Sequence, residues 1–186
     1  MTIGLARTNA EAHLYMELHP CPRCGEAVFD STSSVITTPA GLASRYTGAC
    51  PGCGTGREFE FDLPEVVLFP PAHGVRFGGD QPSRIVDAGE WLFVADMVLE
   101  HVAAVPDPRA SAAELAGAKR DVEMAVAALD EVLKFLPAGA DTAPPSAFWT
   151  DRGRQVQAAE PGRFRRVRLL AVREAYQRIA AAYAAL

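Results

Sequence analysis

Cys21-Pro22-Arg23-Cys24-Gly25 and Cys50-Pro51-Gly52-Cys53-Gly54 are two copies of one pattern, CPxCG, with 25 residues between the two cysteine pairs. Two cysteines three positions apart can wrap a tight turn whose main-chain amides point at the sulfurs, and the following glycine supplies the left-handed conformation that closes the turn. Two such turns provide four thiolates, which form a tetrahedral ligand set suited to zinc. The spacing therefore predicts one structural Zn²⁺ per chain, held by Cys21, Cys24, Cys50 and Cys53.

Around these motifs the sequence resembles the zinc-ribbon families, in which two CPxCG knuckles are paired across a small β-sheet. The resemblance covers residues 15–63, about a quarter of the chain, and it implies a structural metal without implying an activity. Strands are expected over residues 33–38, 42–49 and 57–63. The last of these alternates strictly, with Phe59, Phe61 and Leu63 on one face.

Other chemistries of the cysteine pairs remain alternatives. Rubredoxins bind iron with the same doubled pattern, but they surround the metal with a dense aromatic set, whereas only Phe29 and Tyr46 lie between the two pairs here. A glutaredoxin-like redox motif needs a helix that starts at the first cysteine, and Gly25 and Gly54 would break such a helix. Disulfides are unexpected because the N-terminus shows no export signal, which also predicts a cytoplasmic location.

The remainder of the chain is predicted to be a loop followed by helices. Residues 64–82 contain four prolines and three glycines, so they are expected to form a linker, with a short strand over 66–69. A first helix is capped by Asp80 or Ser83, and a second begins at the capping box formed by Ser111 and Glu114. Two more helices are expected over residues 147–159 and from about Phe164 to the end.

These elements predict an α+β protein. It consists of a zinc ribbon over residues 1–63, a linker over 64–82, and an antiparallel bundle of about four helices over 83–186. Aromatic residues at helical spacing are expected in the core of the bundle, namely Trp91, Phe135, Phe148, Trp149, Phe164, Tyr176 and Tyr183.

Charge is distributed unevenly along the chain. Residues 1–145 contain 10 Lys and Arg against 20 Asp and Glu, whereas residues 146–186 contain 8 Arg against 3 acids. We expect this basic tail to dock on the acidic helices, because the whole chain carries a net charge of −5 and nucleic-acid modules are usually basic. In the alternative interpretation, the tail binds nucleic-acid phosphates through Arg152, Arg154, Arg163, Arg165, Arg166 and Arg168.

The composition, 49% apolar and 22% charged, excludes a disordered chain, and no apolar run approaches the ~20 residues that span a bilayer. No catalytic motif is present. A hidden acid–base site would be expected in the linker, where His73 could meet Asp62, Glu65 or Asp80. His19 is the expected neighbour of the metal. The excess of arginine over lysine, 16 to 2, is typical of GC-rich bacterial genomes.

Together these features favour a non-enzymatic interaction protein over an enzyme. We expect an adaptor, a regulatory subunit or an immunity-type protein whose partner is another protein, with nucleic acid as the second choice and no membrane association.

Overall fold

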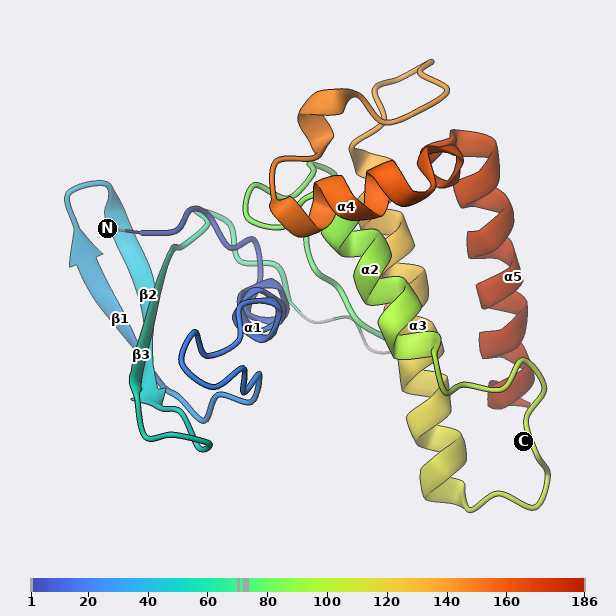
Figure 1. The fold of residues 1–186 in the computed structure, drawn as a ribbon, viewed down its shortest axis with the longest axis horizontal. Helices are drawn as coiled ribbons and strands as arrows, with labels where there is room; N and C mark the ends of the chain where they lie inside the picture. Colours follow the sequence, from blue (N-terminus) through green and yellow to red (C-terminus); the bar gives the residue numbers. More distant parts are fainter. Residues whose placement is uncertain (1, 70, 72–73, 186) are drawn as a thin grey trace. The chain divides into compact units, whose positions relative to one another are not determined.

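The computed structural model describes residues 2–69, 71 and 74–185, and it shows a mixed α+β protein (Figure 1). A three-stranded antiparallel sheet and five α-helices are present in the described part, which confirms the predicted class. The chain forms two compact units. The first comprises Met1–Phe69, Phe77–Gly79 and Ser83–Ile85, and the second comprises Pro70–Arg76, Asp80–Pro82 and Val86–Leu186.

The sheet of the first unit has the strand order β1-β2-β3, with β1 at Thr32–Thr38, β2 at Gly41–Ala49 and β3 at Gly56–Asp62. These bounds lie within one residue of those predicted. The N-terminal segment lines the outer edge of β3, since the Ile3 amide donates to the Glu60 carbonyl at 2.8 Å. The predicted strand over residues 66–69 is wrong: this segment has no strand pairing, and most of its side chains are exposed.

Helix α1, at Asn9–Leu18, was not predicted, because the N-terminal 63 residues were interpreted as β-rich. Thr8 caps it by accepting a hydrogen bond from the Glu11 amide at 3.1 Å. The helix packs on the sheet through Tyr15, whose ring centroid lies 5.5 Å from that of Phe61. This helix leads the chain directly into the first cysteine knuckle.

The second unit contains four helices: α2 at Ala88–Leu99, α3 at Ala112–Lys134, α4 at Asp151–Ala159 and α5 at Arg166–Ala184. Helix α3 packs against both α2 and α5, and α2 also packs against α4. A regular four-helix bundle is not confirmed. No helix in the described part is long and apolar enough to cross a bilayer.

The N-terminus of α2 differs from the prediction. Neither Asp80 nor Ser83 caps this helix; Asp87 does so in a capping box with Glu90. The fully buried Asp87 carboxylate also accepts hydrogen bonds from the amides of Trp149 and Thr150, at 2.9 and 2.8 Å. Asp87 therefore joins the start of α2 to the start of α4, a role that depends on tertiary packing.

Three further expectations for the helical unit need correction. The helix expected over residues 147–159 begins at Asp151, after a short 3₁₀ turn at Pro145–Ala147. Phe164 is buried, but it belongs to a second 3₁₀ turn that precedes α5, and its ring lies 4.8 Å from that of Phe148. Trp149 is 40% exposed, so it is not part of the core. Its main-chain amide donates to Asp87, which holds the residue at the start of α4.

Candidate metal centre

The two cysteine knuckles have the same main-chain hydrogen bonds. The Gly25 amide donates to the Cys21 carbonyl at 2.8 Å, and the Gly54 amide donates to the Cys50 carbonyl at the same distance. The two glycines have φ angles of 77° and 72°, which an L side chain rarely adopts. Glycine in the fifth position therefore closes each turn in the manner that the sequence pattern predicts.

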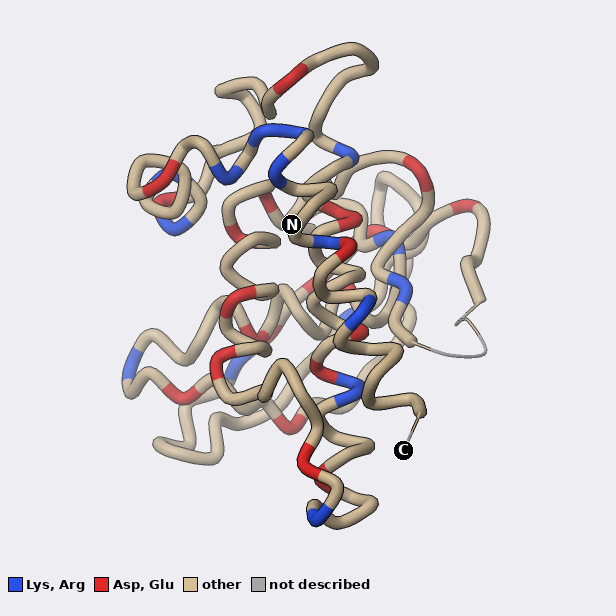
Figure 2. Tube along the Cα trace, turned by 90° about the vertical axis from the view of Figure 1, so that its right-hand side faces the viewer, with Lys and Arg blue, Asp and Glu red and all other residues tan. Residues whose placement is uncertain are grey.

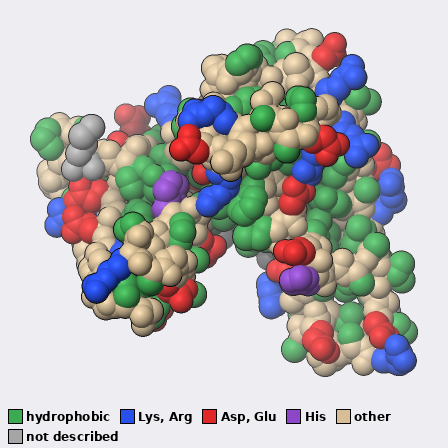
Figure 3. All heavy atoms as spheres, in the orientation of Figure 1, with side chains coloured by type: hydrophobic (Ala, Val, Ile, Leu, Met, Phe, Trp, Pro, Cys, Tyr) green, Lys and Arg blue, Asp and Glu red, His purple; other side chains and the backbone are tan. Residues whose placement is uncertain are grey.

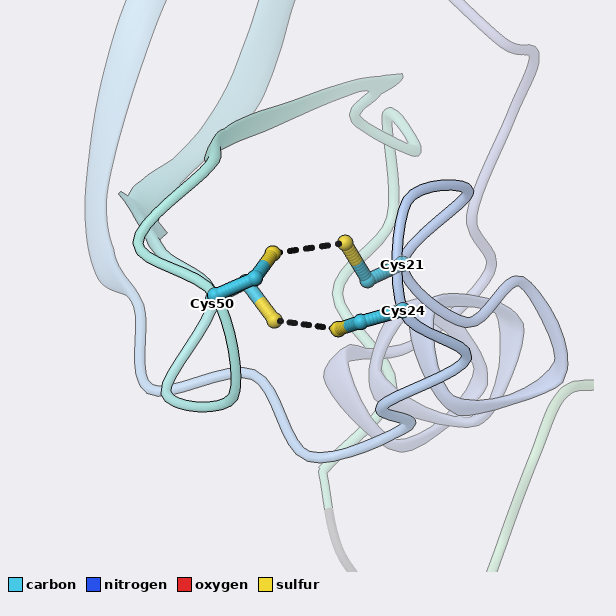
Figure 4. A group of neighbouring side chains, drawn as sticks. Cys21, Cys24 and Cys50 are labelled. Atoms are coloured by element: carbon cyan, nitrogen blue, oxygen red, sulfur yellow. Dashed lines mark hydrogen bonds between the residues drawn. The ribbon is translucent and has the colours of Figure 1, made fainter.

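The structure brings all four cysteine sulfurs to within 4.8 Å of one another. The Sγ atoms of Cys21 and Cys53 are 3.6 Å apart and those of Cys24 and Cys50 are 3.5 Å apart (Figure 4). A tetrahedron with metal–sulfur bonds of ~2.3 Å has edges of about 3.8 Å, whereas a disulfide needs ~2.05 Å. The spacing fits one tetrahedral metal ion and does not fit a pair of disulfides.

Burial distinguishes the two cysteines of each knuckle. Cys21 and Cys50, the first of each pair, are each 1% exposed, whereas Cys24 is exposed and Cys53 is partly so. The first cysteines therefore anchor the site in the core of the unit, and the second cysteines close it on the solvent side.

The thiols of the cluster differ in acidity. Hydrogen bonds to the side chain and main chain of Thr55 lower the pKa of Cys53 to about 6. The Glu26 main chain lowers the pKa of Cys24, but the neighbouring Cys50 and Cys53 outweigh it and the pKa rises to about 12. Four clustered thiols cannot all ionise without a cation among them, so this ligand set is chemically suited to a metal.

Arg57, the second residue of β3, is the functional residue that sequence reasoning missed. Its guanidinium is buried and donates to the main-chain carbonyl of His19 at 2.6 Å. It lies over the rings of Phe29 and Phe59, at 4.6 and 5.2 Å from their centroids, and its Nη1 is buried without a hydrogen-bond partner. The strict alternation of β3 could have revealed it, because Arg57 shares the inward face of Phe59 and Phe61.

The described histidines do not join the cysteine cluster, which is the only group of metal-ligating side chains found among the residues that the structure describes. The His19 ring stacks on Tyr15 with centroids 3.9 Å apart, and its Nδ1 lies 2.8 Å from the Tyr15 carbonyl oxygen. His73 lies outside the described residues, so its expected pairing with Asp62, Glu65 or Asp80 stays a prediction.

Several arginines of the C-terminal segment bind groups of their own unit. Arg163 forms a two-point ion pair with Asp96 of α2, at 2.7 and 2.6 Å. Arg166 donates to the carbonyls of Ala140, Pro137 and Leu136, at 3.0, 2.9 and 3.2 Å. These contacts are those expected of a docked tail.

Of the other four arginines of the predicted set, two also pair with acids of their own unit and two are exposed. Arg152 lies 3.8 Å from the buried Glu90, and Arg154 pairs within its own helix with Asp151 at 2.6 Å. Arg165 and Arg168 are exposed. Basic and acidic positions are interspersed over the helices (Figure 2). Four of the six arginines are therefore engaged with groups of their own unit.

Comparison of the chain with known protein families, curated proteins and solved structures finds no match. The likeness to zinc ribbons therefore rests on the doubled CPxCG pattern, the strand order and the convergence of four sulfurs.

Proposed function

We propose that this chain is a non-enzymatic, zinc-binding interaction protein whose Cys₄ site has a structural role. The observation that carries the proposal is the convergence of Cys21, Cys24, Cys50 and Cys53 within 4.8 Å on two equivalent knuckles. Four protein thiolates complete the tetrahedral coordination of zinc and leave no position for water or substrate. Such an ion supplies folding free energy to its domain.

Zinc is favoured over iron by the surroundings of the donors rather than by their identity. Both metals accept tetrahedral thiolate ligands. Of the two aromatic residues between the cysteine pairs, Phe29 packs on the Arg57 guanidinium and Tyr46 donates to Asn9 Oδ1 at 2.6 Å. Both rings are therefore engaged in packing within the unit.

The buried acids of the second unit support a non-catalytic role. Asp87 and Glu90 are 0% and 2% exposed, and their carboxylates accept hydrogen bonds from helix-terminal amides. Burial raises the pKa of Glu90, while the Asp87 main chain partly opposes that change. This arrangement is typical of acids that cap one helix and join it to a neighbouring helix.

A protein partner is supported by an exposed apolar segment in the first unit. Val66, Val67 and Phe69 are 74%, 68% and 77% exposed within four residues. Contiguous exposed apolar side chains mark sites of protein association more often than isolated ones do. We propose that this segment contacts a partner protein in an adaptor, regulatory or immunity-type role, within the reducing cytoplasm where thiolate sites persist.

Site-specific photo-crosslinking in the source cell tests this function. A photoreactive residue at position 67 should crosslink one discrete protein, and the yield should fall when Val66 is replaced by Lys. The matched control places the same residue at Gln155, an exposed position on α4. Equal crosslinking from both positions, or none from position 67, contradicts a protein-binding role for this segment.

Nucleic-acid binding is the second candidate, and it rests on the exposed Arg165 and Arg168. On the face shown in Figure 3, charged side chains of both signs are mixed with hydrophobic ones over the helices. Titration with generic DNA and RNA at several salt concentrations separates the two functions. A phosphate-binding surface loses affinity steeply with salt, with a slope of about one unit per contact, whereas we expect no measurable binding.

A further inference from the structure

The two edges of the sheet in the first unit are unlike each other. The edge of β3 is covered by the N-terminal segment, where the Asp62 amide donates to the Gly4 carbonyl at 2.9 Å. The opposite edge is β1, which is the outermost strand of the sheet (Figure 1). A strand at an open edge presents unpaired main-chain groups that can pair with another strand.

The register shows which groups of β1 point outward. The Leu63 amide donates to the Leu42 carbonyl at 3.0 Å, so the main-chain groups of Leu42 face β3. Because this direction alternates along a strand, Ala43 and Arg45 face β1 instead. Their partners Ile36 and Ser34 therefore face β2. It follows that three residues of β1 direct their amides and carbonyls away from the sheet: Ser33, Val35 and Thr37.

The side chains of β1 offer no protection against pairing. The strand reads TSSVITT, without a charge or a proline, and all seven residues are exposed or half-buried. Natural edge strands usually carry a lysine, a proline or a bulge that prevents association. The register of β1 with β2 is continuous and has no bulge. The strand therefore carries none of the features that usually block pairing at an edge.

We propose that β1 pairs with β1 of a second copy of this chain, antiparallel about a two-fold axis through Val35. The outward-facing residues are placed symmetrically about position 35, so Val35 meets Val35 of the second copy and Ser33 meets Thr37. Each such pair can exchange two hydrogen bonds, as antiparallel strands do. The uncharged strand places no like charges opposite each other, and a two-fold interface requires this self-complementarity.

A second copy fits this edge because the outward-facing residues are symmetric about Val35 and no charge of the strand would face its own counterpart. Among the side chains, Val35 would stabilise the dimer, because it is 64% exposed and would pack against Val35 of the second copy across the axis. One pair of short strands buries less than the ~1,200 Å² of a stable complex, so the association depends on protein concentration. An extended segment of another protein could use the same edge, and the first experiment distinguishes the two.

Residue-resolved amide hydrogen exchange on the zinc-loaded full chain, recorded over a range of concentrations, tests this pairing. Ser34 and Ile36 should be protected at every concentration, because their amides face β2. Ser33, Val35 and Thr37 should gain about tenfold protection as the chain associates. If these three amides exchange rapidly at all concentrations, or become protected only when another protein is added, pairing with a second copy is wrong.

Sedimentation of a charged edge variant provides the second test. Val35→Lys places two ammonium groups opposite each other, so the dimer dissociation constant should rise by about tenfold or more and recover partly at high salt. Val105→Lys is the matched control, since Val105 is 78% exposed and lies outside the sheet. Zinc content and circular dichroism confirm that both variants fold. A wild-type monomer at all concentrations, or equal dissociation constants for the two variants, overturns the proposal.

Discussion

The Arg57 guanidinium donates a 2.6 Å hydrogen bond to the main-chain carbonyl of His19. Arg57 follows the second cysteine knuckle on β3, and His19 stands two residues before Cys21 of the first knuckle. The same guanidinium also donates to the Met16 carbonyl at 3.3 Å. One buried side chain therefore links the two halves of the metal centre independently of the metal.

Replacing Arg57 with Met should loosen this link while keeping much of the side-chain volume. We expect the free energy of unfolding of the first unit to fall by about 2 kcal/mol, the cost of losing buried hydrogen bonds from a charged donor. Release of zinc to a chromogenic chelator should accelerate. Arg45→Met is the control, because Arg45 is 41% exposed and forms a surface ion pair with Glu60. Equal release rates for the two variants would refute the linking role of Arg57.

Asp87→Ala should destabilise the second unit more than any other single cap substitution. The carboxylate accepts from the Glu90 amide, from the Trp149 and Thr150 amides and from the Thr150 hydroxyl, all at 2.8–2.9 Å. Because several buried hydrogen bonds are lost, the free energy of unfolding measured by urea denaturation should fall by about 3–5 kcal/mol. Ser111→Ala removes the exposed cap of α3 and should cost about 1 kcal/mol. Similar costs for the two variants would contradict the joining role of Asp87.

Replacing the arginines at the start of α5 should have two different effects on stability, depending on the residue. Arg166→Gln should lower the melting temperature, because it removes hydrogen bonds to three carbonyls and costs about 1–2 kcal/mol. Arg168→Gln, an exposed position on the same helix, should change stability by less than about 0.5 kcal/mol. If both variants remain as stable as the wild type but lose affinity for nucleic acid, the tail is a binding surface and the docked interpretation is wrong.

Cys50→Ser should unfold the sheet and leave most helical structure intact. The proposed metal supplies folding free energy to the first unit, whereas four of the five helices in the described part belong to the second. Far-ultraviolet circular dichroism should therefore retain most of its helical signal, while amides of β1–β3 lose protection. Ser34→Ala, at an exposed position of β1, serves as the control. Complete loss of helical signal would show that the two units fold as one.

The parts of the structure that depend on short sequence patterns were predictable. The knuckles, the three strands and the Ser111–Glu114 capping box are all local, so residue spacing identifies them. Helix α1 was missed because it is short and lies within a region otherwise rich in strand-forming residues. The role of Asp87 was missed because its partners Trp149 and Thr150 lie more than sixty positions away.

The cysteine cluster could be predicted in full, but its surroundings could not. The sequence pattern predicts Arg57 only as the first residue of an alternating strand. Its burial depends on Phe29 and on the carbonyl of His19, which the fold brings to it. The segment over residues 66–69, predicted as a strand, contains β-branched residues but has no neighbouring strand to pair with. A high β-propensity alone therefore does not produce a strand.

Elemental analysis of the full chain, purified without chelators, tests the central claim most directly. The account predicts one zinc per chain in the wild type and its loss in the Cys50→Ser variant, because Cys50 is a buried member of the ligand set. A wild-type chain that contains no metal, or one that carries a single iron and is red, contradicts the structural zinc site.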